Sequence, residues 1–293
     1  MILVVGATGL LGGEICRRLA TADKPIRAMV RPTANPTRVE NLKALGATLV
    51  QGDLRNRASL DAACEGVTAV ITTVSTTLSR QPGDSIQTVD LDGQLRLIDA
   101  AKTARVRQFI YVSFSHHLDV DCPLTTAKRT VEASLKRSGL NYTILAPTFF
   151  MEVWLSPTLG FDAGKGTAQI YGSGATKIGW ISLNDVAQFA VACLDNPAAR
   201  HATIELGGPE ALSPLDVVRC FEEAGGRKFQ VEHVTEDVLN AQKAATSDPL
   251  QQSFAALMIG YAHGDPIDMR KTLQQFPISL LSVREYARGV VRA

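Results

Sequence analysis

Three glycines near the start of the chain have the spacing of a phosphate-binding turn. Gly6, Gly9 and Gly12 lie in "VVGATGLLGG", between an apolar run and an amphipathic stretch. Gly6 allows a tight turn after a strand, Gly9 lets a pyrophosphate approach the backbone, and Gly12 permits close packing of a helix on that strand. Free amide groups at the start of the helix would face the anion. The pattern therefore predicts a dinucleotide site. The other candidate contacts in this loop are Thr8, Leu10 and Leu11.

A basic residue follows the second apolar run of the chain. The run "IRAMV" ends directly before Arg31, where proteins that bind NAD usually have Asp or Glu to hold the ribose 2′-hydroxyl. A guanidinium instead suits a 2′-phosphate, through its charge and its forked donors. The sequence thus favours NADP over NAD, with Thr33 as an additional donor. Arg38 and Arg55 are either assisting cations or solvated surface charges.

The elements that must position these residues alternate along the first half of the chain. Continuous apolar runs indicate strands buried on both faces, and the stretches between them have helical periodicity. The predicted strands are 2–5, 26–30, 48–51, 67–74, 107–113 and 141–146. The predicted helices are 10–21, 37–45, 57–65, 85–104 and one that carries Lys128. This alternation predicts an α/β fold with a doubly wound parallel sheet.

The pattern changes after Pro147. A polar, glycine-rich segment (160–180) is followed by a short strand and a helix that Asn184 or Asp185 would cap. Further strands are predicted at 202–208 and 228–234, and further helices near 213–225, 235–245, 247–260 and 282–292. We expect residues 1–150 to form a dinucleotide-binding domain with a return segment near 180–200. Residues 151–293 would form a smaller, interleaved α+β lobe that binds a substrate or a partner.

Composition excludes several classes of partner. Among 293 residues, 30 basic and 29 acidic side chains give a net charge of +1, so nothing favours nucleic acid. No run reaches the 18 or so apolar residues of a membrane span. The five cysteines are scattered, which predicts reduced thiols that pack as small apolar residues, with no metal site. We expect a cytoplasmic protein that binds neither membrane nor metal; oligomeric state is left open.

Several segments spread along the chain carry one shared pattern. They are "GATGLLGG", Arg31, "VQGDL", "ITTVS", "FIYVSFS", "YTILAPTFF", "WISLNDVA" and "FPISLLSVREYA". The combination resembles the NmrA-like group of atypical short-chain dehydrogenases, which share the Rossmann fold. That group includes quinone and triphenylmethane reductases, isoflavone-type reductases and NADP-sensing regulators with no known turnover. The resemblance covers nearly the whole chain and is specific for the family rather than for a substrate.

The resemblance implies roles for residues at the ends of the third and fourth strands. Asp53 and Leu54 would flank the adenine of the dinucleotide. Thr73, Val74 and Ser75 would line the ribose of the nicotinamide half.

The resemblance also implies a nicotinamide site. Ser113 and Phe114 would lie beneath the nicotinamide, and Lys128 would hold the ribose hydroxyls. The wall near the carboxamide would consist of Pro147, Thr148, Phe149 and Phe150. For Phe149 and Phe150, packing within the lobe is the alternative.

One residue departs from the pattern of short-chain reductases. A tyrosine usually stands four residues before the lysine, on the same helix face, and donates a proton as hydride arrives. This chain has Leu124 there, which has no proton to give. His116 and His117 follow the fifth strand and are candidate donors, because imidazole titrates near neutrality. The alternative is that both are exposed loop residues.

Two classes of function fit these residues. The first is an NADPH-dependent reductase of a quinone-like or aromatic electrophile, since a strong electrophile accepts hydride without a strong acid and solvent can protonate the product. The second is a non-catalytic NADP-binding regulator that reports redox state through a protein partner. A sugar-nucleotide epimerase or dehydratase is a weaker third, because that chemistry needs a general base where Leu124 stands.

Overall fold

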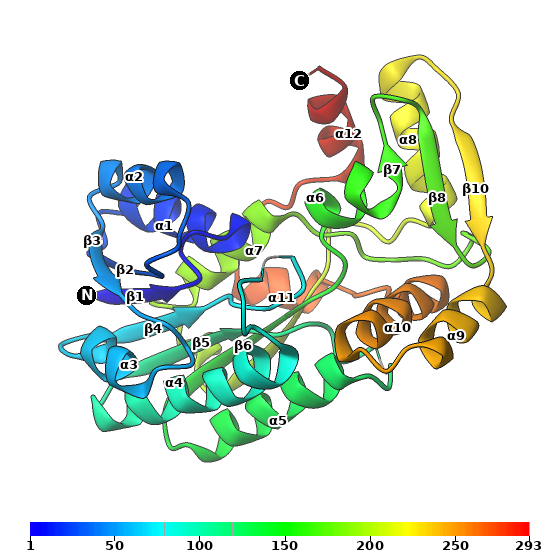
Figure 1. Cartoon of the computed structure of the whole chain (residues 1–293). Coiled ribbons are helices and arrows are strands. Elements are labelled where there is room, and N and C mark those ends of the chain that lie inside the picture. Colours follow the sequence, from blue (N-terminus) through cyan, green and yellow to red (C-terminus); the bar gives the residue numbers. More distant parts are fainter. Residues whose placement is uncertain (79, 119, 293) are drawn as a thin grey trace. The chain divides into compact units, whose positions relative to one another are not determined.

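The computed structural model describes residues 1–78, 80–118 and 120–292. The chain forms two units (Figure 1). The first consists of Met1–Ser113, Pro123–Leu145 and Val186–Ile204. The second consists of Phe114–Cys122, Ala146–Asp185 and Glu205–Ala293. Each unit therefore draws on several separate segments of the sequence.

The first unit contains a seven-stranded sheet in the order β3-β2-β1-β4-β5-β6-β9. Its strands are β1 (Ile2–Val5), β2 (Ile26–Val30), β3 (Thr48–Gln51), β4 (Ala69–Thr72), β5 (Gln108–Val112), β6 (Asn141–Pro147) and β9 (Ala202–Leu206). Every neighbouring pair from β3 to β6 is parallel. All residues of β1, β4 and β5 are buried, so these runs show no polar alternation. The predicted α/β fold is confirmed.

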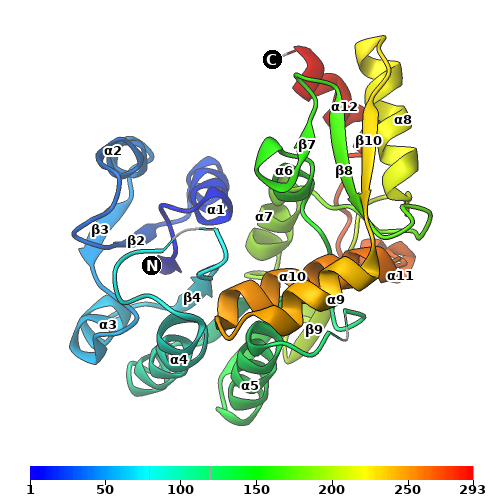
Figure 2. The ribbon, with the colours of Figure 1, turned by 45° about the vertical axis from the view of Figure 1, so that its right-hand side comes forward.

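Helices cover both faces of this sheet (Figures 1 and 2). One face carries α1 (Leu10–Thr21) and α2 (Pro36–Ala44), and the other carries α3 (Arg57–Cys64), α4 (Asp92–Thr103) and α5 (Pro123–Arg137). Helix α1 buries Leu11, Ile15 and Leu19, whose spacing of four residues places them on one side. The predicted helix 85–104 is divided, because a π-helical turn, η1 (Ile86–Leu91), precedes α4.

Helix α7 (Leu183–Ala192) begins two residues earlier than a cap at Asn184 would allow. Ser182 Oγ accepts a hydrogen bond from the Asp185 amide at 3.0 Å, so Ser182 satisfies an amide at the helix start. The expectation that Asn184 or Asp185 is the cap was wrong. Asp185 lies in the first turn, and its carboxylate accepts from the Leu281 amide at 2.9 Å.

The second unit has its own sheet, in the order β10-β8-β7. Strand β8 (Thr167–Tyr171) pairs parallel with β10 (Gln230–Val234) and antiparallel with β7 (Phe161–Asp162). The helices of this unit are α6 (Met151–Trp154), α8 (Pro214–Gly225), α9 (Glu236–Ala245), α10 (Pro249–His263), α11 (Arg270–Gln275) and α12 (Val283–Arg292). Helix α8 packs on α12, and α9 packs on α10 (Figure 1). In the ranges that the structure covers, no helix is both long and apolar enough to cross a bilayer.

An aromatic cluster fills the core of the second unit. The ring of Phe149 lies edge-on to Trp154 and Tyr261, with centroid distances of 4.8 and 5.8 Å. Tyr261 also stacks on Trp154 at 5.5 Å and packs edge-on against Trp180 at 5.7 Å. Such contacts stabilise a core beyond the area they bury. Phe149 is thus a packing residue of this unit.

All five cysteines are buried and free of disulfides. Burial raises the pKa of Cys16 and Cys193 to about 12 and that of Cys64 to about 11. These side chains pack as small apolar groups, as the sequence predicted.

In the glycine loop, the backbone at the start of α1 packs tightly against the backbone that follows β1. Gly6 adopts a φ of +91°, which few residues other than glycine tolerate. A Cβ atom on Gly12 would lie 2.1 Å from the Gly6 carbonyl oxygen, whereas one on Gly13 would have its nearest neighbour at 3.5 Å. Gly12 is therefore required for packing, and Gly13 is not.

These two neighbours give a matched test of the junction. Gly12→Ala should lower the free energy of unfolding by about 1–3 kcal/mol, because the loop and helix must move apart. Gly13→Ala should leave it unchanged or raise it by up to about 1 kcal/mol, through better helix propensity. Urea unfolding of both variants measures the difference. Equal stability of the two variants would show that the junction relaxes without strain.

Candidate dinucleotide and substrate site

Predicted site residues follow five parallel strands of the first unit. Gly6, Arg31, Thr73 and Ser113 come directly after β1, β2, β4 and β5, and Asp53 comes two residues after β3. Because the strands are parallel, their carboxyl ends lie at one edge of the sheet. Ligands of open α/β sheets bind at this edge.

The glycine loop is open to a ligand at one position. A Cβ on Gly9 would meet only the Gly6 carbonyl oxygen, at 3.1 Å, so little of the protein fills the space beside it. Gly9 is the N-cap of α1, and within the described residues no side chain caps that end. Thr8 accepts a hydrogen bond from Arg38 at its carbonyl oxygen, at 2.7 Å. Leu10 is exposed and Leu11 is buried. The Gly9 amide itself donates to the Gly6 carbonyl at 2.9 Å, so the amides of the first turn of α1, which follow Gly9, are the ones that can receive an anion.

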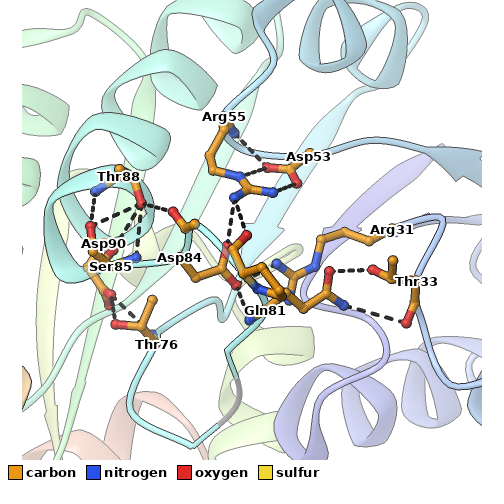
Figure 3. A network of polar contacts seen from close by, with 12 residues as sticks. Arg31, Thr33, Asp53, Arg55, Thr76, Gln81, Asp84, Ser85, Thr88 and Asp90 are labelled. Atoms are coloured by element: carbon orange, nitrogen blue, oxygen red, sulfur yellow. Dashed lines mark hydrogen bonds and ion pairs between the residues drawn. The ribbon is translucent and has the colours of Figure 1, made fainter.

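Arg31, which directly follows β2, forms an ion pair with a buried carboxylate. Its Nη1 donates to Asp84 Oδ2 at 2.7 Å (Figure 3), and the Asp84 side chain is only 2% exposed. Thr33 donates its hydroxyl to the side-chain oxygen of Gln81. The segment that contains Gln81 and Asp84 follows β4, so sequence spacing gave no sign of these contacts. The predicted 2′-phosphate cation is already paired with a carboxylate.

Asp53 and Leu54 lie at the end of β3 in different environments. Asp53 receives both Nε and Nη2 of Arg55, at 3.1 and 2.9 Å, and this pairing lowers the pKa of the Asp53 carboxyl. Leu54 is buried in the apolar core of the unit. Asp53 thus forms an exposed ion pair with Arg55. That Asp53 flanks the adenine of the dinucleotide stays a prediction.

The buried carboxylate of Asp90 fixes the loop after β4 through hydrogen bonds. Asp90 Oδ2 accepts from the backbone amide and the hydroxyl of Thr76, at 3.1 and 2.6 Å (Figure 3). Thr73 donates its amide to the Val5 carbonyl at 3.0 Å, and Val74 accepts from Gln94 at 3.3 Å. Ser75 accepts from the Thr77 hydroxyl at 3.3 Å. The predicted ribose-lining segment is thereby fixed beside the glycine loop, since a Cβ on Gly6 would lie 2.7 Å from Thr73 Oγ1.

Lys128 is a buried ammonium with few interactions. In the described part of the chain, its one hydrogen-bond acceptor is the Val112 carbonyl at 3.5 Å, and Nζ lies 5.3 Å from the centroid of the Tyr111 ring. Burial lowers the pKa of Lys128 below its ordinary value, against the opposing effect of the Asp90 and Glu132 carboxylates. An ammonium in this position has donors to spare for a hydroxyl-bearing ligand.

Helix α5, which carries Lys128, contains no tyrosine. Leu124 is buried, on the same helix and one turn before the lysine. Tyr111 is buried on β5, and its hydroxyl has no hydrogen-bond partner among the described residues. Burial raises the pKa of Tyr111, which makes it a poor acid. Ser113 donates to Glu132, which also receives Arg129 at 2.6 Å.

The second unit holds the two histidines, each beside a carboxylate. His116 Nδ1 lies 2.5 Å from Glu205 Oε1. His117 Nδ1 lies 3.3 Å from Asp265 Oδ1, which also accepts from the Ser115 hydroxyl at 3.1 Å. Asp265 is fully buried, and burial raises its pKa. Both imidazoles are thus held in place, although the His117 side chain is 52% exposed.

The remaining predicted residues also belong to the second unit. Phe114 packs partly buried at the edge of its apolar core. Pro147 accepts at its carbonyl oxygen from the Ser115 amide at 2.9 Å, and Thr148 donates its amide to Leu206 at 2.9 Å. Phe150 pairs with Ile181 in an isolated bridge and is half-buried. Their roles toward a nicotinamide stay predictions.

Four polar residues escaped the sequence analysis. They are Gln81, Asp84, Glu205 and Asp265, and each contacts a predicted site residue. All but Gln81 are charged residues without a motif. The four residues lie from 48 (Gln81 to Thr33) to 148 (Asp265 to His117) positions along the chain from the predicted site residues that they contact. Only the folded chain brings them together.

Comparison with known proteins gives a consistent result. The model of the NmrA-like family matches residues 1–277. An NAD(P)H azoreductase of Xenophilus azovorans is 33% identical over 261 residues, 88% of this chain and 85% of that protein. The photosystem II assembly factor Ycf39 of Cyanophora paradoxa is 32% identical over 234 residues, 80% of this chain and 71% of that protein. The chain spans from 60% to 85% of the length of such curated relatives.

A solved structure shares the fold along the whole chain. The NADPH-dependent quinone oxidoreductase QOR2 of Escherichia coli, complexed with NADPH, superposes with a TM-score of 0.80 and 24% identity, over 99% of both chains.

The burial of Lys128 predicts an effect on stability that depends on pH. Lys128→Met keeps the length of the side chain and removes the charge, so it should raise the free energy of unfolding at pH 7 by on the order of 1 kcal/mol. Because the folded-state pKa of Lys128 lies below the ordinary 10.5, the unfolded chain binds this proton more readily. The gain should therefore shrink as the pH rises towards and past 10.5.

Denaturant unfolding at several pH values, with exposed Lys136→Met as the control, measures this gain. A loss of stability at neutral pH would show that the Lys128 ammonium is well satisfied inside the protein.

Proposed function

The chain belongs to the NmrA-like family, and we propose that it is an NADPH-dependent reductase of small quinone-like or aromatic electrophiles. The observation that carries the proposal is the buried Lys128 ammonium of α5, which has few hydrogen bonds among the described residues. It contacts the carbonyl of Val112, the last residue of β5, at the sheet edge that also presents the glycine loop and Arg31. A buried cation with spare donors is costly to a fold, and it is commonly found at a functional site.

The residues of the first unit fit a dinucleotide along this edge. The open space at Gly9 and the uncapped start of α1 suit the pyrophosphate. Arg31 suits a 2′-phosphate, and Lys128 suits the hydroxyls of the second ribose. The name of the azoreductase relative includes NAD(P)H, and the quinone oxidoreductase neighbour contains NADPH. These observations support NADP(H) as the cofactor.

The chemistry of this site rests on positioning rather than on a strong acid. NADPH supplies the hydride when it is bound. Lys128 would orient the ribose and place positive charge near an oxyanion that develops on the acceptor. The buried side chain of Leu124 occupies the position of the usual phenol and has no acidic proton. Azo compounds and quinones are strong electrophiles, so hydride transfer to them does not depend on a protonated side chain.

A regulatory role is the second candidate. It is favoured by Leu124 at the tyrosine position and by relatives that are named photosystem II assembly factors. In that role the protein would bind NADP(H) and present a face to a protein partner without turnover.

An assay of NADPH oxidation against a panel of quinones, azo dyes, triphenylmethane dyes and enones separates the two candidates. We expect turnover with quinones and cationic dyes, and little with unactivated ketones, because the site lacks a strong acid. Lys128→Met should reduce kcat/KM at least tenfold, whereas Lys136→Met should not. Tight NADPH binding with no turnover on any acceptor would support the regulator.

The two histidines should not be indispensable proton donors if turnover occurs. General acid catalysis typically contributes about 10²–10⁴-fold, and an activated acceptor can do without it. We expect His116→Ala, His117→Ala and the double variant to lose only a fewfold in kcat/KM between about pH 5 and 9. A loss above about a hundredfold, together with a changed pH profile, would instead identify an imidazole as the donor. Glu205→Gln or Asp265→Asn should then reproduce part of that loss.

A further inference from the structure

A short segment after β4 is fastened onto the ends of β2 and β3. Gln81 exchanges contacts with the side chain and carbonyl of Thr33 (Figure 3). Arg55 Nη1 donates to the Pro82 carbonyl at 2.9 Å. Gly83 has a φ of +83°, and a Cβ there would lie 2.5 Å from the same nitrogen. Residues 81–84 therefore pack so closely against Arg55 that a side chain at position 83 would displace the guanidinium.

The carboxylate of Asp84 lies between the two guanidinium groups. Its Oδ2 accepts from Arg31 Nη1 at 2.7 Å and from the Gln81 amide at 2.8 Å. Its Oδ1 is buried, makes no hydrogen bond to any described residue, and lies 3.5 Å from Arg55 Nη1. Asp84 Oδ2 therefore accepts from one of the Arg31 donors, and Asp84 Oδ1 is available to accept a hydrogen bond from Arg55.

This arrangement balances the charges at the adenosine end of the proposed dinucleotide site. Arg31 and Arg55 are positive, and Asp53 and Asp84 are negative, so the four charges sum to zero. A 2′-phosphate that binds Arg31 must share the guanidinium with Asp84 and lie near a like charge. A 2′-hydroxyl carries no charge and meets neither cost.

Given the proposed function, we propose that Asp84 is a specificity-determining residue that limits the preference for NADP(H) over NAD(H). Arg31 attracts the 2′-phosphate, and Asp84 weakens that attraction by holding one edge of the same guanidinium. Because Arg55 is close to Oδ1, it can take over the carboxylate when Arg31 turns to the phosphate, so Asp84 need not be left buried without a cation. The two arginines and two aspartates would then exchange ion-pair partners when the 2′-phosphate binds.

A purely structural role for Asp84 makes a different prediction. If the carboxylate only staples the segment to β2, or only orients Arg31 for the phosphate, then its removal should weaken binding of the phosphorylated ligand. If it competes with the phosphate, its removal should strengthen that binding. The sign of one measured change therefore separates the two roles.

Two fragments isolate the 2′-phosphate from the rest of the dinucleotide. Adenosine 2′,5′-bisphosphate and adenosine 5′-phosphate differ only in that group, and calorimetry measures their binding without any turnover. The parent protein should bind the bisphosphate at least tenfold more tightly, and Arg31→Ala should remove that difference. Asp84→Asn retains an oxygen for the Arg31 and Gln81 donors and removes only the charge.

We expect Asp84→Asn to bind the bisphosphate about tenfold more tightly than the parent does, with binding of the monophosphate within about twofold. Asp61→Asn is the matched control, because Asp61 forms an exposed ion pair with Arg57 at 2.8 Å on α3, and both affinities should stay unchanged. Asp84→Ser provides a second removal of the charge should the amide impair folding, which urea unfolding reports. The gain should fall below about threefold in an Arg31→Ala background, since it acts through that guanidinium.

Several outcomes overturn the assignment. Weaker or unchanged binding of the bisphosphate to both folded Asp84 variants would show that the carboxylate supports Arg31 rather than competing for it. An undiminished gain without Arg31 would contradict the sharing of that side chain. If the parent binds neither fragment, the proposed function fails and the role of Asp84 fails with it. If it binds both and only the gain is missing, the proposed function stands.

Discussion

The contact between the start of α1 and the end of β1 is the constraint on which the rest of the site depends. Gly12 brings the helix so close to the Gly6 carbonyl that no Cβ fits between them. This approach aims the uncapped amides of α1 at the carboxyl edge of the sheet. The parallel register of the other strands then places Arg31, Asp53, Thr73 and Ser113 along the same edge. One tight backbone contact thus sets where each of these residues can act.

The two ends of the proposed dinucleotide site differ in how their charges are satisfied. At the adenosine end, Arg31 and Arg55 are paired with carboxylates before any ligand binds. At the nicotinamide end, Lys128 has, among the described residues, one long hydrogen bond to a backbone carbonyl and the face of a tyrosine ring. A ligand gains little electrostatic energy at the adenosine end, because it must replace existing ion pairs. It gains more at the nicotinamide end, because the Lys128 ammonium still has N–H donors to offer. Discrimination between ligands would therefore be set at the first end and orientation at the second.

The sequence predicted those features that local periodicity and turn chemistry determine. Continuous apolar runs identified the strands of the parallel sheet, and the glycine spacing identified the loop after β1. It did not predict the π-helical turn before α4, because a single wider turn of six residues is too short to be recognised in an apolar pattern that is read over a whole helix. It placed the cap of α7 at Asn184 or Asp185, although the Ser182 hydroxyl reaches the helix amide. Asp84, Glu205 and Asp265 lack any local signature, because their partners come from distant segments.

The burial of all five cysteines has a chemical consequence for the proposed reduction of electrophiles. A thiolate adds readily to a quinone ring, and the addition would tether the acceptor to the protein permanently. Only the deprotonated sulfur is reactive, and its fraction is very small when the thiol pKa lies near 11 or 12, as for Cys64, Cys16 and Cys193. Burial also keeps the acceptor from reaching the sulfur. The packing that fills the core with small side chains thereby makes the protein durable towards the very compounds that it is proposed to reduce.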